Sequence, residues 1–220
     1  MSESLVVYTV IIGKYDTLKP PLAIDPNVRH VCITDGPLPN VPPWTQRVVR
    51  GNHGPARRHS RLYKTMSHAC FPLAEYSLYV DGRIQLKIHP EEALGWLKNH
   101  DMALCQHPTD DCAYAEAQKV KDWLLDDFVV VSRQMARYRE EGYPKKNGLA
   151  AGTVILRRHT RMVQKFNNYW WIEVGNNSSR DQLSLNYCLW LLGMGHDVIP
   201  GHLFRNPNFV YHEGHNGYRL

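Results

Sequence analysis

Tyr76-Ser-Leu-Tyr-Val-Asp-Gly-Arg-Ile84 is an apolar stretch that reads as a buried strand and ends abruptly in Asp81-Gly82. A carboxylate at the tip of such a strand is held at the edge of a sheet, and the glycine lets a ligand or metal approach the backbone. In open α/β sheets this edge binds ligands. The stretch therefore predicts that Asp81 holds a divalent cation against a phosphorylated substrate. The alternative is an Asp that only opens a turn, since Asp-Gly is a common turn pair.

Strands and helices alternate on both sides of this stretch. Strands are predicted at 5–12, 28–34, 45–50, 76–81, 102–107 and 152–157. Helices are predicted at 57–71, 91–97, 159–171 and 182–192, and two more between 112 and 142 meet near Asp126-Asp127. Ser178 and Ser179 are N-cap candidates for the last helix. This alternation, without a linker or repeat, predicts a single α/β domain over residues 1–220.

The composition is that of a soluble globular protein, with 43% hydrophobic and 21% charged residues in a chain of 220. No run approaches the roughly 18 apolar residues that span a bilayer, so we expect no membrane span. The first residues lack the features of a signal peptide, which predicts a cytoplasmic protein. The five cysteines are widely spaced and form no CxxC pair, which favours buried thiols over a disulfide framework or zinc site.

The formal charge of +5 is concentrated in a short basic region, residues 47–64. RGG, RNP and zinc-finger patterns are absent, so the region favours a phosphorylated small molecule over nucleic acid. Arg57, Arg61 and Lys64 are spaced i, i+4, i+7, and one helix face can carry all three toward a diphosphate. A solvated basic face is the ordinary alternative.

Several short motifs resemble the DUF616 family, the glycosyltransferase-like domain of the plant TOD1/MUCI70 proteins. They follow one another in order over most of the chain: Tyr8-Thr-Val-Ile-Ile-Gly-Lys-Tyr-Asp16, Ile33-Thr-Asp35, Arg61-Leu-Tyr-Lys64, Tyr79-Val-Asp-Gly82, His107-Pro108 with Cys112-Ala-Tyr-Ala-Glu-Ala117, and Arg180-Asp-Gln-Leu-Ser184. The resemblance implies a GT-A-like (Rossmann-like) mixed sheet flanked by helices. It also implies a nucleotide-sugar-dependent glycosyltransferase that uses a UDP- or GDP-sugar and a glycan or other hydroxyl acceptor.

Enzymes of this fold neutralise the leaving diphosphate with a metal and with Arg or Lys, so Mn²⁺ or Mg²⁺ is the implied cofactor. Asp81 stands where the DxD motif of the fold class falls, but the third position is Arg83 instead of an acid. Either another ligand completes the metal site, or Arg83 supplies part of the cation's charge. His202 and His212 are candidate ligands, with surface-loop histidines as the alternative.

The resemblance places the nucleotide base and ribose at the end of the first strand. Thr9, Gly13 and Tyr15 lie there, and Tyr15 can stack on the base or simply pack the loop. Asp35, after the second strand, can accept a hydrogen bond from ribose or base, or can open an Asp-Gly turn.

On the acceptor side, Asp181 begins a helix, where its carboxylate is expected to point outward with Arg180 and Gln182 beside it. It can bind sugar hydroxyls or take the acceptor's proton, or it can cap the helix and pair with Arg180. Gly152 is expected to let a sugar lie against the backbone. Weaker candidates are His107, Glu116 and the pair Trp170 and Trp171, of which one tryptophan is expected in the core.

The glycosyltransferase hypothesis requires residues 9–15, 57–64 and 81 to line one cleft for an anionic ligand. Two alternatives stay open. One is a non-catalytic domain that binds nucleotide-sugars or glycans, which the incomplete DxD motif allows. The other is a metal-dependent hydrolase, because one plant member of the family is described as a ceramidase.

Overall fold

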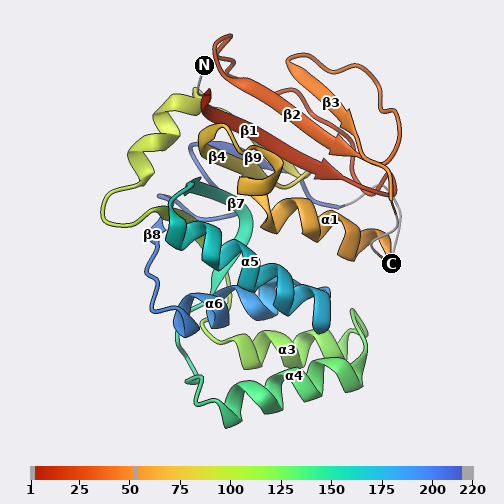
Figure 1. The fold of residues 1–220 in the computed structure, drawn as a ribbon, viewed down its shortest axis with the longest axis vertical. Coiled ribbons are helices and arrows are strands. Elements are labelled where there is room, and N and C mark those ends of the chain that lie inside the picture. Colours follow the sequence, from red (N-terminus) through yellow and green to blue (C-terminus); the bar gives the residue numbers. More distant parts are fainter. Residues whose placement is uncertain (1–2, 52–53, 215–220) are drawn as a thin grey trace.

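The computed structural model describes residues 3–51 and 54–214. Seven strands form one mixed sheet (Figure 1). In spatial order they are β3 (Trp44–Val48), β2 (Arg29–Thr34), β1 (Glu3–Ile11), β4 (Ala74–Val80), β7 (Ala150–Arg158), β6 (Met102–Gln106) and β8 (Asp197–Val198). The predicted α/β class with a mixed sheet is confirmed.

The strand order creates a place where a ligand can bind at the carboxyl ends of the parallel strands. β1 is parallel to β2 on one side and to β4 on the other, whereas β7 is antiparallel to both of its neighbours. The chain therefore proceeds from β1 first to one side and later to the other. At such a switch point the loops after the strands diverge and leave a crevice at the carboxyl ends.

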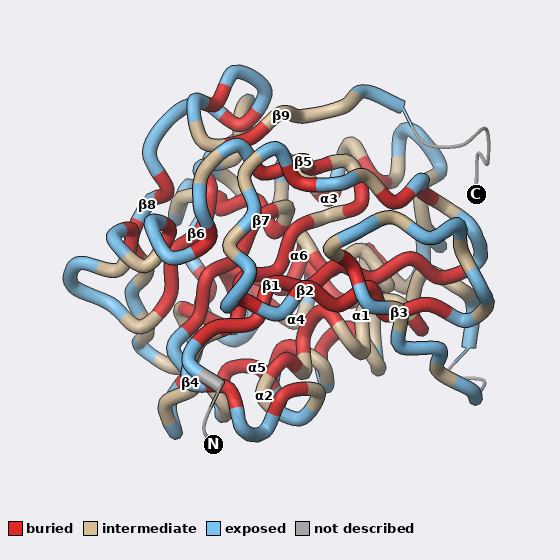
Figure 2. The backbone as a smooth tube through the Cα atoms, turned by 90° about the horizontal axis from the view of Figure 1, so that it is seen from above, coloured by how far each residue is buried: buried red, intermediate tan, exposed pale blue. Residues whose placement is uncertain are grey.

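The two faces of β1 belong to two different cores, because alternate residues of a strand point to opposite faces. Val6, Tyr8 and Val10 pack in the core that contains the helices. Leu5 and Val7 pack in the core that contains the 3₁₀ helix η1 (Pro90–Trp96) and the two-stranded ribbon of β5 (Ile84–Leu86) and β9 (Phe209–Tyr211). The strands are buried along most of their length (Figure 2).

The helices form a continuous stack on their side of the sheet (Figure 1). α1 (Ala56–Thr65) packs on α5 (Arg161–Asn176), and α5 packs on α6 (Gln182–Leu191). α6 contacts α3 (Ala113–Asp122), which contacts α4 (Phe128–Glu140). The predicted pair of helices between 112 and 142 is thus confirmed. No helix within the described ranges has the length and apolarity to cross a bilayer.

Some local predictions are wrong in detail. The predicted helix at 57–71 is interrupted at Met66, after which the short α2 (Ser67–Cys70) begins. Ser178 and Ser179 do not cap α6, whose N-cap is Asp181; both hydroxyls instead donate to Asp126. All five cysteines are free thiols, as expected, but only Cys32, Cys105 and Cys188 are buried; Cys70 and Cys112 are partly exposed.

Arg157 on β7 fixes the end of α1 from inside the protein. It is fully buried, and its guanidinium donates to the carbonyl oxygens of Lys64 (2.9 Å) and Thr65 (3.0 Å). The last carbonyls of a helix have no partner within the helix, so these bonds supply donors to buried groups. The Tyr8 hydroxyl is a second donor to Lys64 O (2.9 Å). Ser67 and Asn167 accept the remaining bonds. The helix that carries Arg57 and Arg61 is thereby held against the sheet.

We expect Arg157→Met to lower the free energy of unfolding by about 1–3 kcal/mol, because the buried carbonyl of Thr65 loses the Arg157 donor, whereas that of Lys64 still accepts from the Tyr8 hydroxyl. Urea unfolding followed by circular dichroism measures this change. Arg158→Met is the matched control: Arg158 is the next residue on β7, is exposed, and should cost less than about 1 kcal/mol. Equal effects of the two substitutions would contradict this role of Arg157.

Candidate functional site

A cavity lies at the carboxyl ends of β1 and β4, and we call it the first cavity. The predicted site residues that line it are Gly13, Tyr15, Arg57, Arg61, Asp81, Arg83 and Arg180. They come from four distant parts of the sequence. The predicted convergence of the first strand's end, the basic helix and Asp81 is therefore confirmed. The role of each residue in binding or catalysis stays a prediction.

A second cavity adjoins the first. Arg61, Asp81, Arg83 and Arg180 line both. Only the second is lined by Lys64, which was predicted to face the diphosphate, and by five other candidates: His107, Glu116, Gly152, Asp181 and Gln182. The predicted nucleotide-side and acceptor-side residues are thus divided between two cavities with a common wall.

Asp81 both opens a turn and lines the two cavities, so the two interpretations of its sequence are compatible. Its backbone N–H donates to Thr153 O on β7 (2.8 Å), and its Oδ1 accepts from the backbone N–H of Arg83 (3.3 Å). Gly82 is required because a Cβ there would lie 2.6 Å from the Cβ of Asp16. The glycine therefore makes room for the side chain of Asp16, which lines the first cavity together with Asp81.

Arg83 places a positive charge where a metal ion was expected. Its Nε lies 3.5 Å from Asp81 Oδ1, and its guanidinium lies 5.0 Å from the centre of the Tyr211 ring. Burial lowers the pKa of Arg83, but Asp81, Tyr211 and Asp16 outweigh burial and raise it. A divalent cation at Asp81 would be repelled by this guanidinium.

The predicted metal ligands do not meet at Asp81. His202 Nδ1 accepts from the backbone N–H of Phe204 (3.2 Å), and His212 Nε2 lies 3.1 Å from Gln85 Oε1. Neither histidine lines the two cavities, and neither belongs to a three-residue group of potential ligands within the described ranges. The structure thus does not bring Asp81, His202 and His212 together, and a metal site at these residues stays a prediction. Around Asp81, Arg83 supplies a positive charge that repels a cation, whereas Asp16 in the same cavity lining supplies a second carboxylate.

Asp181 is buried in an ion pair and does not point outward as predicted. Its Oδ1 accepts from Arg61 Nε (2.8 Å), and its Oδ2 accepts from the Lys64 ammonium. Burial raises the pKa of this carboxyl, but Arg61 and Lys64 outweigh burial and lower the pKa to about 2. Such a carboxylate is a weak base, so the structure does not support Asp181 as the group that takes a proton. It pairs with α1 and not with Arg180.

Lys64 is directed into the protein and does not extend toward a diphosphate as predicted. Its side chain is 5% exposed and its ammonium lies 5.1 Å from the centre of the Tyr79 ring. A Cβ at position 152 would lie 3.0 Å from this ammonium. Gly152 therefore makes room for Lys64, where we expected room for a sugar. Gln182 supports the same strand, since its amide donates to Ala150 O and its Oε1 accepts from Gly152 N.

Arg57 and Arg180 differ from the other cations of the first cavity because neither has a carboxylate at ion-pair distance in the described part of the chain. Arg57 donates to Leu125 O (2.8 Å), and Arg180 Nε is buried without a hydrogen-bond partner. Burial, Arg57 and Arg61 together lower the pKa of Arg180. An anion between these guanidinium groups would relieve their mutual repulsion.

Two nucleotide-side predictions are not supported by the geometry. Thr9 does not line the first cavity: it lies on β1 between Tyr8 and Val10, and its side chain points to the opposite face of the sheet. Asp35 does not line the cavity either, because its carboxylate accepts from the backbone N–H of Gly13 at 3.0 Å and ties two loops together. On the acceptor side, Trp170 is the core tryptophan, as expected of one of the pair.

The sequence analysis missed Asp16, Ser60 and Tyr211. Asp16 and Ser60 line the first cavity, and Tyr211 lines the second. Ser60 lies one turn after Arg57 on α1, so helical spacing could have indicated it. For Tyr211, which reaches the site through the β5–β9 ribbon, the sequence holds no comparable signal.

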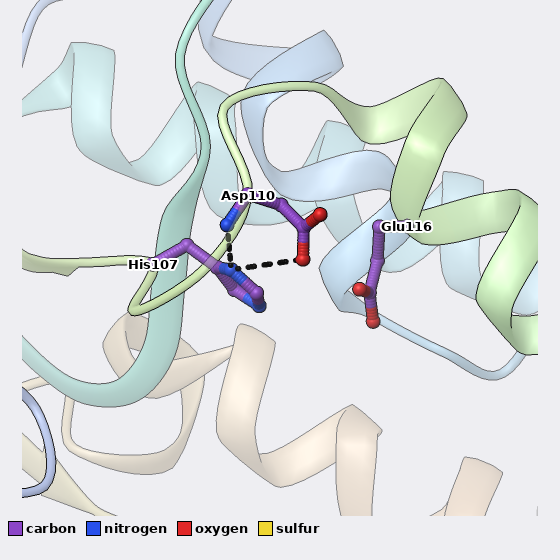
Figure 3. A group of neighbouring side chains, drawn as sticks. All are labelled: His107, Asp110 and Glu116. Carbon is purple, nitrogen blue, oxygen red and sulfur yellow. Dashed lines mark hydrogen bonds and ion pairs between the residues drawn. The ribbon is translucent and has the colours of Figure 1, made fainter.

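His107, Asp110 and Glu116 offer potential ligand atoms within 4.8 Å of one another (Figure 3). The hydrogen bonds oppose a metal there. His107 Nδ1 accepts from the backbone N–H of Asp110 (3.0 Å), so in the neutral ring the proton is on Nε2. Burial lowers the pKa of His107 and favours this neutral ring. Asp110 is already paired with the Lys119 ammonium. The group therefore presents a donor, Nε2–H, and a carboxylate, Glu116.

Comparison with known proteins identifies relatives for most of this chain. A family model described as TOD1/MUCI70, glycosyltransferase-like domain, matches residues 44–210. The chain is 30% identical over 155 residues to the probable hexosyltransferase MUCI70 of Arabidopsis thaliana. The aligned region covers 65% of this chain and 27% of that protein. It is 28% identical over 136 residues to the alkaline ceramidase TOD1 of the same plant. This aligned region covers 56% of the chain and 29% of TOD1. The chain thus spans less than a third of either relative. The resemblance noted in the sequence is confirmed.

We expect Asp181→Asn to lower the free energy of unfolding by about 3–5 kcal/mol, because it leaves the buried Lys64 ammonium and Arg61 beside each other without a counter-charge. The folded-state pKa of about 2 is below the unfolded value. The pair's contribution should therefore be complete above about pH 4 and be lost as the pH falls toward 2.

Urea unfolding at pH 7 and at pH 3 measures both effects, with Asp111→Asn as a control at an exposed carboxylate. If Asp181→Asn were as stable at pH 7 as this control, the ion pair would not have the structural importance that we assign to it.

Proposed function

This chain belongs to the TOD1/MUCI70 glycosyltransferase-like family, and from this premise we propose that it transfers a sugar from a nucleoside diphosphate sugar to a hydroxyl acceptor. The premise supports a glycosyltransferase in general terms. The nature of the donor, the way in which its diphosphate is held, and the acceptor are the specific parts of the proposal.

The observation that carries the proposal is the charge of the first cavity. Four arginines line it against two carboxylates, Asp16 and Asp81, which leaves an excess of two positive charges. The diphosphate of a nucleotide-sugar carries two negative charges. Guanidinium groups bind phosphate oxygens in a bidentate way, and neither Arg57 nor Arg180 has a carboxylate at ion-pair distance among the described residues.

The remaining walls of the first cavity suit a nucleoside. Val10 and Ile12 provide apolar surface, and Tyr15 provides an aromatic ring on which a base can stack. All three follow or end β1, beside the arginines. In the proposed pose the base lies against Tyr15, and the diphosphate lies between Arg57 and Arg180.

In the transition state the bond from the sugar to the diphosphate breaks, and negative charge grows on the leaving oxygen. Fixed guanidinium groups aimed at that oxygen stabilise the charge without having to reorganise. We propose that Arg61, Arg83 and Arg180, which line both cavities, supply this stabilisation. Asp181 positions Arg61 through the ion pair at its Nε. No step of this scheme requires a divalent metal.

A panel of UDP- and GDP-sugars tests the proposal against the two alternatives. Transfer to a glycan or small alcohol acceptor, or slow hydrolysis of the donor, would support it. Nucleotide binding without turnover of any donor would instead indicate a binding module. Zinc-dependent cleavage of an amide without nucleotide binding would indicate a hydrolase.

We expect Arg57→Ala and Arg180→Ala each to raise the Kd for UDP or GDP by about 10- to 100-fold, the equivalent of about 1.5–3 kcal/mol for a hydrogen bond to a charged group. Isothermal titration calorimetry measures the affinity. Arg133→Ala on the exposed face of α4 is the control and should leave the Kd unchanged. A wild-type protein that binds neither nucleotide would refute the proposed donor.

We further expect sugar transfer to persist in EDTA and to change less than about twofold when Mn²⁺ or Mg²⁺ is added, because Arg83 occupies the position beside Asp81. Initial rates with and without each ion provide the measurement. Loss of transfer in EDTA with recovery in Mn²⁺ would show that a metal, and not the arginines alone, carries the diphosphate charge.

A further inference from the structure

An exposed phenylalanine lines the second cavity. Phe204 lies in the loop between β8 and β9 and is 47% exposed, whereas the preceding Leu203 is 5% exposed. Leu203 packs in the core that contains η1, but Phe204 belongs to neither core of the described chain. Single exposed apolar side chains are common on protein surfaces, so a role for Phe204 depends on what surrounds it.

The loop holds Phe204 in a fixed position. The side-chain amide of Asn206 donates to Pro200 O (3.0 Å). The backbone N–H of Phe204 donates to His202 Nδ1 (3.2 Å). Gly201 has a φ of +97°, and a Cβ there would lie 2.9 Å from Asn206 Nδ2, so the turn requires a glycine. A ring that is already fixed loses little conformational freedom when a ligand covers it.

The ring of Phe204 is available for stacking. Its two aromatic neighbours are tilted against it: Tyr211 at 63° with 4.8 Å between ring centres, and His202 at 65° with 5.6 Å. Tyr211 also lines the cavity, but the guanidinium of Arg83 already lies 5.0 Å from the centre of its ring. Phe204 is therefore the ring of this cavity against which a ligand can lie.

The same cavity offers a hydrogen-bond donor and an acceptor. His107 and Glu116 both line it, and their side chains lie close together (Figure 3). The backbone of Asp110 leaves neutral His107 with Nε2–H as a donor, and Glu116 has no ion pair within the described ranges. A hydroxyl group accepts one hydrogen bond and donates another, so this pair suits the hydroxyl groups of a ligand.

An aromatic ring in a cavity that also binds hydroxyl groups matches a carbohydrate. The C–H face of a sugar ring is apolar and packs on an aromatic ring, while the hydroxyl groups at its edge need polar partners. A phosphate has no apolar face and would be repelled by Glu116. A lipid alcohol would need an apolar wall along its chain, whereas the described lining of this cavity includes seven charged side chains.

We propose that the second cavity contains a carbohydrate subsite in which a sugar ring stacks on Phe204 while its hydroxyl groups bind His107 and Glu116. This inference rests on the proposed function and deepens it, because it makes the hydroxyl acceptor a sugar residue. Phe204 is then a residue that determines which acceptors bind.

An array of mono- and oligosaccharides, probed with labelled wild-type protein, identifies the carbohydrate that binds, and titration calorimetry measures its Kd. We expect Phe204→Ala to raise this Kd by about tenfold or more, because the variant loses the apolar surface that the sugar covers. Phe204→Tyr keeps the ring and should stay within about threefold of wild type. Phe128→Ala is the matched control, since Phe128 on α4 is 60% exposed and lines neither cavity.

Two further measurements separate binding from folding. Thermal unfolding of Phe204→Ala should give a Tm within about 2 °C of wild type, because the ring is outside both cores. On the wild-type protein, saturation of aromatic protons should pass by NMR to the C–H protons of one face of the bound sugar. Absence of this transfer would overturn the proposal even if the variant did not fold.

A wild-type protein that retains no carbohydrate from the array would also overturn the subsite, as would a Kd for Phe204→Ala within about twofold of wild type. A matching loss of UDP or GDP affinity would do so as well, because the ring would then contact the nucleotide. Failure of the proposed function is a different result: wild-type protein would neither bind nor consume any nucleotide-sugar. Sugar transfer by Phe204→Ala with an unchanged KM for the acceptor would refute only the subsite.

Discussion

The carboxylate of Asp181 holds together three elements that the site needs in fixed positions. It lies at the start of α6, accepts from two cations of α1, and lies 3.6 Å from where a side chain at position 152 of β7 would begin. A buried charge of this kind is tolerated only when its partners are complete, since loss of one leaves another unpaired in a region with little water. Arg61 is therefore held by Asp181 on one side and borders both cavities on the other.

This pairing also decides which cations are available to a ligand. Lys64 forms an ion pair with Asp181 inside the protein, and Arg83 lies beside Asp81. Within residues 3–51 and 54–214, Arg57 and Arg180 have no carboxylate at ion-pair distance, and the pKa of Arg180 is lowered in part by its cationic neighbours. The region thus combines satisfied ion pairs, which give rigidity, with two guanidinium groups whose repulsion a bound anion would relieve.

The sequence was sufficient for six strands of the main sheet, the longer helices and the place where they meet, because apolar periodicity and the rule that ligands bind at the carboxyl ends of strands act over long stretches. It did not indicate the short strands β5, β8 and β9. The sequence did not predict the directions in which several of the site side chains point. Arg57 and Lys64 share a helical face, yet Arg57 lines the first cavity, whereas Lys64 lines only the second and is paired with Asp181. Thr9 was assigned to the wrong face of its strand, and Asp181 gave no sign that its partners lie 117 and 120 residues away. These outcomes depend on tertiary packing, which local patterns do not encode.

The β5–β9 ribbon has a consequence for how the protein is made. It pairs Ile84 with Tyr211, and the backbone of His212 donates to Arg83 O (2.9 Å). The four parallel strands require only residues 3–80, whereas the surroundings of Arg83 require contacts across more than a hundred residues. Contacts across loops of that length form late, because closing the loop costs conformational entropy before the contacts are made that stabilise it. During synthesis a nascent chain can thus form most of its parallel sheet well before it can complete the wall between the two cavities.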